Sequence, residues 1–162
     1  MNSKYRLMVL ISSAVLVLDQ ITKFWVHQTM ALYQSIEIVP HFVSLTYLRN
    51  TGAAFGLLAG GRSPLRTIFF ILVSALAIGC IFYLFKTLRP QQKTMAVSLS
   101  LVLGGAIGNL VDRIYMGEVI DFIDLHWYQL HWPAFNVADS AITIGVGLLF
   151  VQMLRKGSLT FS

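Results

Sequence analysis

Four long apolar stretches constrain the fold of this chain more than any other feature of its sequence. They cover residues 7–26, 67–85, 94–112 and 136–154. A helix needs about 20 mostly apolar residues to cross the hydrocarbon core of a bilayer, so each stretch predicts a transmembrane helix. Only 12% of the residues are charged and the mean hydropathy is +0.71, whereas soluble domains are about 25% charged. The sequence predicts an all-α membrane protein, with residues 1–162 forming a single domain.

The charged residues predict how these helices are oriented. Seven of the 12 basic residues, and no acid, fall on one side of the predicted membrane: Lys4, Arg6, Lys86, Arg89, Lys93, Arg155 and Lys156. Basic loops stay in the cytoplasm, so both termini are expected there. A nucleic-acid-binding protein would instead gather its basic residues in a patch with polar surroundings, and we expect no nucleic-acid partner.

The connection between the first two apolar stretches predicts a small extracytoplasmic β-sheet. Residues 36–47 contain short apolar and polar alternations, broken at Pro40, which is typical of two short strands. Residues 50–56 then predict a turn that enters an apolar surface segment. The other outward connection holds Trp127, Tyr128 and Trp132, residues that suit an interfacial aromatic belt.

Three carboxylates, Asp112, Asp121 and Asp139, bracket the gap between the last two apolar stretches. A carboxylate at the hydrocarbon boundary is costly and usually has a function. Asp112 shares one side of its helix end with Asn109 and Arg113, either as a local Asp–Arg pair or as a cluster that orients a reactive group. The apolar neighbours of Asp121 press it toward an apolar wall, unless the segment is a solvated loop.

Asp139 stands near the start of the fourth predicted helix, three residues after Asn136 and next to Ser140. Such residues at a helix start are commonly N-caps. Alternatively, Asp139 approaches Asp121, because the third and fourth predicted helices are antiparallel neighbours. Two carboxyls at hydrogen-bonding distance share a proton, so one can activate a water while the other donates to a carbonyl oxygen. That is the aspartic-protease mechanism, which needs neither metal nor cofactor.

Two further features of the apolar stretches predict packing. Asp19 and Lys23 are spaced for an i, i+4 ion pair in the favourable order, and we interpret them as structural, with Lys23 reaching outward to the membrane surface. Gly104 and Gly108 form a small-xxx-small pair that allows close approach of a neighbouring helix. The single Cys80 cannot form an internal disulfide.

Five short motifs occur in order along the chain: Asp19-Gln20-x-Thr22-Lys23; Arg49-Asn50-x-Gly52-Ala53-Ala54-Phe55-Gly56; Gly108-Asn109-x-x-Asp112-Arg113; Val119-Ile120-Asp121-Phe122-Ile123; and Phe135-Asn136-x-Ala138-Asp139-Ser140. Each motif is weak alone, but five in order on four apolar spans are specific. Together they resemble the motifs of the signal peptidase II family, also called the lipoprotein or prolipoprotein signal peptidases. Ile120, where valine is common, is a conservative departure.

The resemblance implies an intramembrane aspartic endopeptidase of the bacterial cytoplasmic membrane, with Asp121 and Asp139 as its catalytic pair. It also implies cleavage of prolipoproteins before a lipobox cysteine that carries diacylglycerol, an active site near the outer leaflet and inhibition by globomycin. Asp19 matches a structural position. The positions that match the lining or support of the family's site are Asn50, Gly52, Asn109, Asp112, Arg113 and Asn136.

The expected partners are therefore lipidated prolipoproteins, membrane lipids and globomycin-type inhibitors, with the enzyme itself a monomer. Residues 52–58 are expected to cover the bound substrate. From the residues alone, two other functions stay open. One is a small proton- or ion-conducting membrane protein that uses the carboxylates as relay sites, although three of the four acids concerned gather at one face. The other is a noncatalytic scaffold that binds through Gly104 and Gly108.

Overall fold

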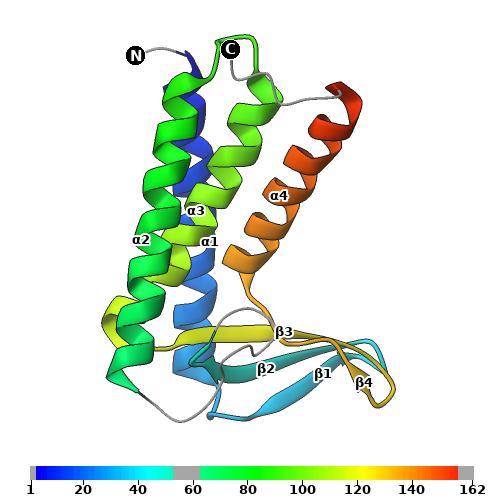
Figure 1. Ribbon diagram of the computed structural model, residues 1–162. Helices are drawn as coiled ribbons and strands as arrows, with labels where there is room; N and C mark the ends of the chain where they lie inside the picture. Colours follow the sequence, from blue (N-terminus) through cyan, green and yellow to red (C-terminus); the bar gives the residue numbers. More distant parts are fainter. Residues whose placement is uncertain (1–2, 53–62, 157–162) are drawn as a thin grey trace.

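The computed structural model describes residues 3–52 and 63–156 and forms a helix bundle with a sheet across one end (Figure 1). The described residues contain four helices long and apolar enough to cross a membrane, which confirms the predicted fold class. The helices are α1 (Ser3–Thr29), α2 (Pro64–Thr87), α3 (Lys93–Met116) and α4 (Val137–Lys156), and the strands are β1 (Ser35–Val39), β2 (Val43–Asn50), β3 (Val119–Trp127) and β4 (Leu130–His131).

The helix ends follow from local sequence. Pro64 opens α2 at the first helical position, where a missing N–H costs nothing because that group has no partner within the helix. Gly117 follows α3 with φ of 76° and donates its N–H to the Arg113 carbonyl at 3.1 Å. This left-handed conformation is one that glycine adopts without strain. The resulting turn leads directly into β3.

Helix α3 is the most buried of the four and packs closely against α1. A Cβ atom added at Gly104 would lie 2.8 Å from Val15 Cβ, and one added at Gly108 would lie 2.6 Å from Asp19 Oδ2. The predicted small-residue contact between helices is therefore confirmed. An apolar core between α2 and α3 contains Ile81, Phe85, Leu88, Met95, Ala96, Leu99 and Leu103.

The outer surfaces of the bundle are apolar as well. On α2, Leu65 is 80% exposed and Leu76 is 70% exposed, and on α4 Phe150 is 59% exposed. Soluble monomers rarely expose large continuous apolar surfaces. A coat of lipid chains accounts for side chains of this kind along the whole length of a bundle.

The sheet is larger than the sequence predicted. The two expected strands are present as β1 and β2, with Pro40 just beyond the end of β1. However, the described sheet has the antiparallel order β1-β2-β3-β4, and its second pair comes from the α3–α4 connection. The first four residues of β3 are all buried, so this strand lacks the alternation that marks a half-exposed strand.

Candidate active site

Asp121 is held by the pairing of β2 with β3, in which Leu48 lies opposite Asp121 and Asn50 lies opposite Val119. The Asp121 side chain is buried, with 4% of its surface exposed. Its Oδ2 accepts a hydrogen bond from Asn50 Nδ2 at 3.0 Å, and its Oδ1 accepts one from Asn136 Nδ2 at 2.7 Å. The solvated-loop interpretation is therefore wrong, because both carboxyl oxygens are held inside the sheet–helix junction.

Asp139 lies in the first turn of α4 and is partly buried. Its Oδ1 accepts from Asn109 Nδ2 at 2.8 Å, and its Oδ2 accepts from the Asn136 main-chain N–H at 3.3 Å. In return, Asn136 Oδ1 accepts the Asp139 N–H at 2.9 Å. This reciprocal pair is a capping arrangement, so the capping interpretation is correct for Asn136. Capping is not the whole role of Asp139, because its carboxyl also lines a hollow.

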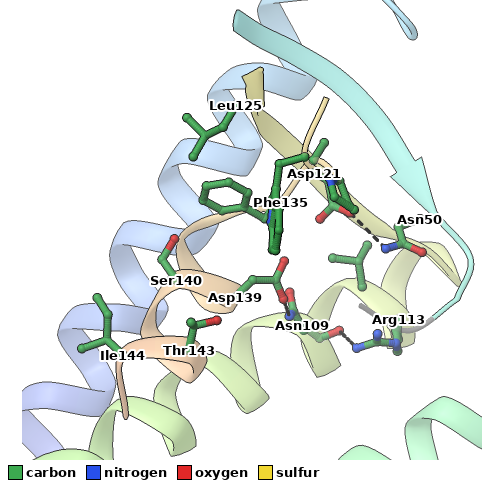
Figure 2. A pocket seen from close by; sticks show the side chains of 14 residues that line it. Asn50, Asn109, Arg113, Asp121, Leu125, Phe135, Asp139, Ser140, Thr143 and Ile144 are labelled. Atoms are coloured by element: carbon green, nitrogen blue, oxygen red, sulfur yellow. Dashed lines mark hydrogen bonds between the residues drawn. The ribbon is translucent and has the colours of Figure 1, made fainter. Parts of the chain in front are cut away.

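Asn136 connects the two aspartates. Its side chain is fully buried and donates to Asp121, while its main chain donates to Asp139. Both carboxyls line one hollow of about 420 Å³ (Figure 2). The structure thus brings together two acids that are 18 positions apart in sequence.

Burial and a neighbouring charge change the acidity of Asp121. Loss of solvent is the main cause that raises its pKa to about 7, and the negative charge of Asp139 adds to it. Hydrogen bonds from Asn50 and Asn136 and the positive charge of Lys23 act in the opposite direction. An aspartate of this pKa holds a proton for about half of the time at neutral pH.

A buried ionic network lies next to the two aspartates and is connected to Asp139 through Asn109. Lys23 Nζ lies 2.8 Å from Asp19 Oδ2 and 2.9 Å from Asp112 Oδ2 and donates to Asn109 Oδ1 at 2.9 Å. Asn109 in turn donates to Asp139. An ammonium group has three N–H donors, and each has an acceptor here. Lys23 therefore fixes the amide that positions Asp139.

The predicted ion pair between Asp19 and Lys23 is present, but the outward orientation of Lys23 is wrong. Lys23 is only 2% exposed, because Asp112 and Asn109 on α3 offer it inward partners. Asp112 also makes no local pair with Arg113. Its carboxyl instead accepts hydrogen bonds from Gln20 Nε2 at 2.9 Å and from the Ile120 N–H at 3.2 Å. It thereby ties α1 to the start of β3.

Arg113 lines the hollow, and Gly52 contacts both Arg113 and Asn50. Asn50 Oδ1 accepts the Gly52 N–H at 2.8 Å, and the Gly52 carbonyl accepts from Arg113 Nη2 at 3.4 Å. The Arg113 guanidinium also lies 5.4 Å from the centre of the Phe70 ring. All six predicted supporting residues thus lie in or next to this cluster. Residues 53–58, the rest of the segment expected to cover substrate, lie outside the described residues.

Sequence reasoning missed much of the mainly apolar lining of the hollow. Several of these lining residues precede or follow Asp139: Trp132, Pro133, Ala134, Phe135, Thr143 and Ile144. Thr143 is four residues from Asp139, a helical spacing that does signal a shared face. The 132–135 segment gave no such signal, because hydrogen bonds between Phe135 and Ile123 hold it beside β3. Within the described residues, no group of His, Cys, Asp and Glu side chains has the geometry to hold a metal ion.

The fold and this site define a class of protein: a multi-pass membrane protein with two aspartates in one hollow at the end of its helix bundle. The Signal peptidase (SPase) II family profile matches residues 11–155 of the chain. The chain belongs to the signal peptidase II family, and it is therefore a peptidase.

Individual relatives agree with this assignment over nearly the whole chain. The lipoprotein signal peptidase of Geobacter sulfurreducens is 51% identical over 156 residues, which are 96% of each protein. That of Syntrophotalea carbinolica is 46% identical over 155 residues, covering 96% of this chain and 95% of the relative. A bacterial membrane enzyme solved by the in meso method has a TM-score of 0.84 at 37% identity, covering 94% of this chain and 90% of the other.

Proposed function

We propose that this chain is an intramembrane aspartic endopeptidase that removes signal peptides from diacylglyceryl-modified prolipoproteins, cutting before the lipidated cysteine. One observation carries the proposal: Asp121 and Asp139 line the same hollow, and Asn136 holds both carboxyls. Membership in the signal peptidase II family supports the substrate class. Asp121 and Asp139 are the catalytic residues in this proposal.

The proposed chemistry needs one ionised and one protonated carboxyl. The ionised aspartate takes a proton from water as the water oxygen attacks the scissile carbonyl carbon, while the protonated aspartate donates to the carbonyl oxygen. The first carboxyl then returns its proton to the leaving amine as the C–N bond breaks, and the second recovers its own proton from the tetrahedral intermediate. The pKa of Asp121, raised to about 7 by burial and by the charge of Asp139, supports this division of one proton between two acids.

The walls of the hollow suit a substrate that arrives from the bilayer. Ile144 and Trp132 line the hollow and are each 57% exposed, so its apolar wall continues onto the outer surface of the protein. A signal peptide is itself a membrane-embedded segment. It therefore enters sideways from the lipid, with its cut site at the polar end of the hollow and its apolar residues against α4.

The same proposal includes an orientation. Both ends of the described chain and the α2–α3 connection lie at one end of the bundle, opposite the sheet (Figure 1). The basic residues at that end favour the cytoplasmic side. The sheet and the two aspartates then lie at the outer leaflet of the bacterial cytoplasmic membrane, where a translocated prolipoprotein presents its cut site.

The arrangement of the acids argues against a proton- or ion-conducting protein. A relay across the membrane needs ionisable groups distributed through its depth. Here Asp19 and Asp112 both pair with Lys23, which is connected to Asp139 through Asn109. Toward the opposite end, the core between α2 and α3 contains a cluster of apolar side chains, and the buried polar residues Ser12, Ser98 and Ser100 are not ionisable.

The proposal is tested with purified full-length protein and a synthetic lipobox peptide whose cysteine carries diacylglycerol. We expect cleavage before that cysteine, and inhibition by globomycin. Asp121→Asn and Asp139→Asn are each expected to lower kcat by at least about 10³-fold, since each removes a proton-transfer group.

Asp124→Asn is the matched control. Asp124 lies on the same strand as Asp121, but its carboxyl pairs with His131 at 3.0 Å and does not line the hollow. We expect this variant to keep its activity. Full turnover by either Asp121→Asn or Asp139→Asn would contradict the assignment of these two aspartates as the catalytic pair. Equal cleavage of the peptide without its lipid would remove the assigned substrate class.

A further inference from the structure

A second hollow, of about 350 Å³, lies at the end of the bundle away from the sheet. Its lining residues come from the start of α1, the α2–α3 connection and the start of α3, which lie at that end of the bundle (Figure 1). Four cationic side chains line it: Lys4 and Arg6 from α1, with Arg89 and Lys93 from the connection and the start of α3. These two pairs are far apart in sequence, so the fold concentrates positive charge around one small volume.

Most of this positive charge is not neutralised by the protein. Lys4 Nζ donates to the carbonyls of Phe85 at 3.2 Å and of Leu88 at 2.6 Å, so it caps the end of α2. The other three cations are exposed, and within the described part of the chain none of them forms an ion pair with a carboxylate. All seven acids lie in other parts of the chain. Bringing like charges together is unfavourable unless an anion joins them.

The start of α3 adds to the same positive field. Its N-cap residue Gln92 makes no side-chain capping hydrogen bond, and its first turn contains no acid. The first N–H groups of a helix and its dipole favour an anion at this position. Lys93, the first residue of α3, lines the hollow. The cations and the helix start therefore act on one volume.

Apart from Ser3, the remaining wall of the hollow is apolar. Leu7 and Leu10 lie on α1 one turn apart, and both line the hollow. Leu10 is 59% exposed, so this wall continues onto the outer surface of a helix that spans the membrane. A ligand that matches both parts carries an anionic group next to a hydrocarbon chain.

We propose that this hollow binds the anionic headgroup of a membrane phospholipid. The headgroup phosphate accepts hydrogen bonds from Arg6, Arg89 and Lys93, and an acyl chain runs along Leu7 and Leu10. A free phosphate ion would leave the apolar wall without a partner. The positive-inside rule explains why cations lie on this side of the membrane, but it does not require residues from two distant segments to line one hollow.

The test uses purified full-length protein in nanodiscs that contain equal amounts of phosphatidylglycerol and phosphatidylcholine. Native mass spectrometry reads which lipids stay bound when the nanodisc is removed. We expect the wild type to retain phosphatidylglycerol in preference to phosphatidylcholine. Arg6→Gln, Arg89→Gln and Lys93→Gln should each lower that preference by about fivefold, as expected for one cation near an anionic headgroup.

Lys86→Gln is the matched control, because it removes one charge from an exposed side chain at the same end of α2 without touching the hollow. An equal loss of preference in Lys86→Gln would overturn the proposal in favour of general surface charge. So would an unchanged preference in the three hollow variants. Displacement of the retained lipid by millimolar inorganic phosphate would overturn the lipid assignment in favour of a soluble anion. Equal unfolding temperatures in pure phosphatidylcholine establish that the variants are folded.

Discussion

At the scale of single residues, the burial of Asp121 links the proposed chemistry to the stability of the fold. The folded protein holds a proton on Asp121 up to about pH 7, whereas an unfolded chain releases it near pH 4. Between these values the folded state binds more protons than the unfolded state. The free energy of unfolding therefore falls as the pH rises from about 4 to 7. Above about pH 7 the contribution of Asp121 no longer changes with pH.

Asp121→Asn removes this pH dependence. We expect the free energy of unfolding of the wild type to fall relative to the variant by up to about 1.4 kcal/mol per pH unit between pH 4 and 7. Unfolding in detergent micelles at pH 4.5 and pH 8 measures the difference. Asp124→Asn is the control. Parallel pH dependence of the wild type and Asp121→Asn would contradict the raised pKa.

Lys23→Met tests the buried ionic network. Removing the ammonium leaves Asp19 and Asp112 without their shared cation, and breaking a buried ion pair in this way costs about 3–5 kcal/mol. Thermal unfolding should show the loss. Cleavage activity should fall in addition, because Asn109 no longer has the donor that orients it toward Asp139. A variant with wild-type stability would show that Lys23 is not the centre of the network.

The single residues also show what local sequence can predict. Asp121 and Asp139 are candidates because acids in apolar surroundings are rare. The double role of Asn136 could not be predicted, because it depends on how β3 lies against the start of α4. The inward direction of Lys23 likewise depends on side chains of α3, which no spacing within α1 reveals.

At the scale of elements, the contact between α1 and α3 sets the position of the site. Asp19 on α1 accepts a hydrogen bond from the Ala138 N–H at 2.9 Å, so a side chain of α1 caps the N-terminus of α4. Gly108 leaves room for the Asp19 carboxyl. One glycine therefore controls a contact that joins α1, α3 and α4.

Gly108→Ala is expected to destabilise the protein by about 1–3 kcal/mol, the usual cost of overpacking, and to lower activity. Gly79→Ala on α2 is the matched control, because a Cβ added there meets nothing within 4 Å. That change should be neutral or stabilising, since alanine favours helix over glycine. Thermal unfolding measures the change in stability of each variant relative to the wild type. Equal effects would show that the Gly108 contact is not tight.

Hydropathy predicted the helices, since a continuous apolar run of this length has few alternatives in a membrane. It could not predict β3. A short apolar segment buried on both faces lacks a distinctive period, and its partner β2 lies about 70 residues earlier in sequence. The elements formed by local pattern were predictable, and the pairing that completes the site was not.

At the scale of the whole molecule, the proposed orientation can be measured directly. The test uses a Cys80→Ser background and cells whose outer membrane has been permeabilised while the cytoplasmic membrane stays intact. We expect Glu37→Cys on β1 to react with a membrane-impermeant maleimide in these cells. Gln91→Cys, in the α2–α3 connection, should react only after the membrane is opened. Both positions are exposed in the structure. The reverse pattern would place the sheet in the cytoplasm and contradict the proposed access to translocated substrates.

The pairing of β2 with β3 also has a consequence for biosynthesis. These strands come from the two separate connections that lie on the sheet side of the bundle, and Asp139 belongs to the final helix. A ribosome-bound chain with only three helices inserted has neither the second aspartate nor the Asn136 amide. In the proposed mechanism, peptidase activity therefore begins only after α4, which carries Asp139, has entered the membrane.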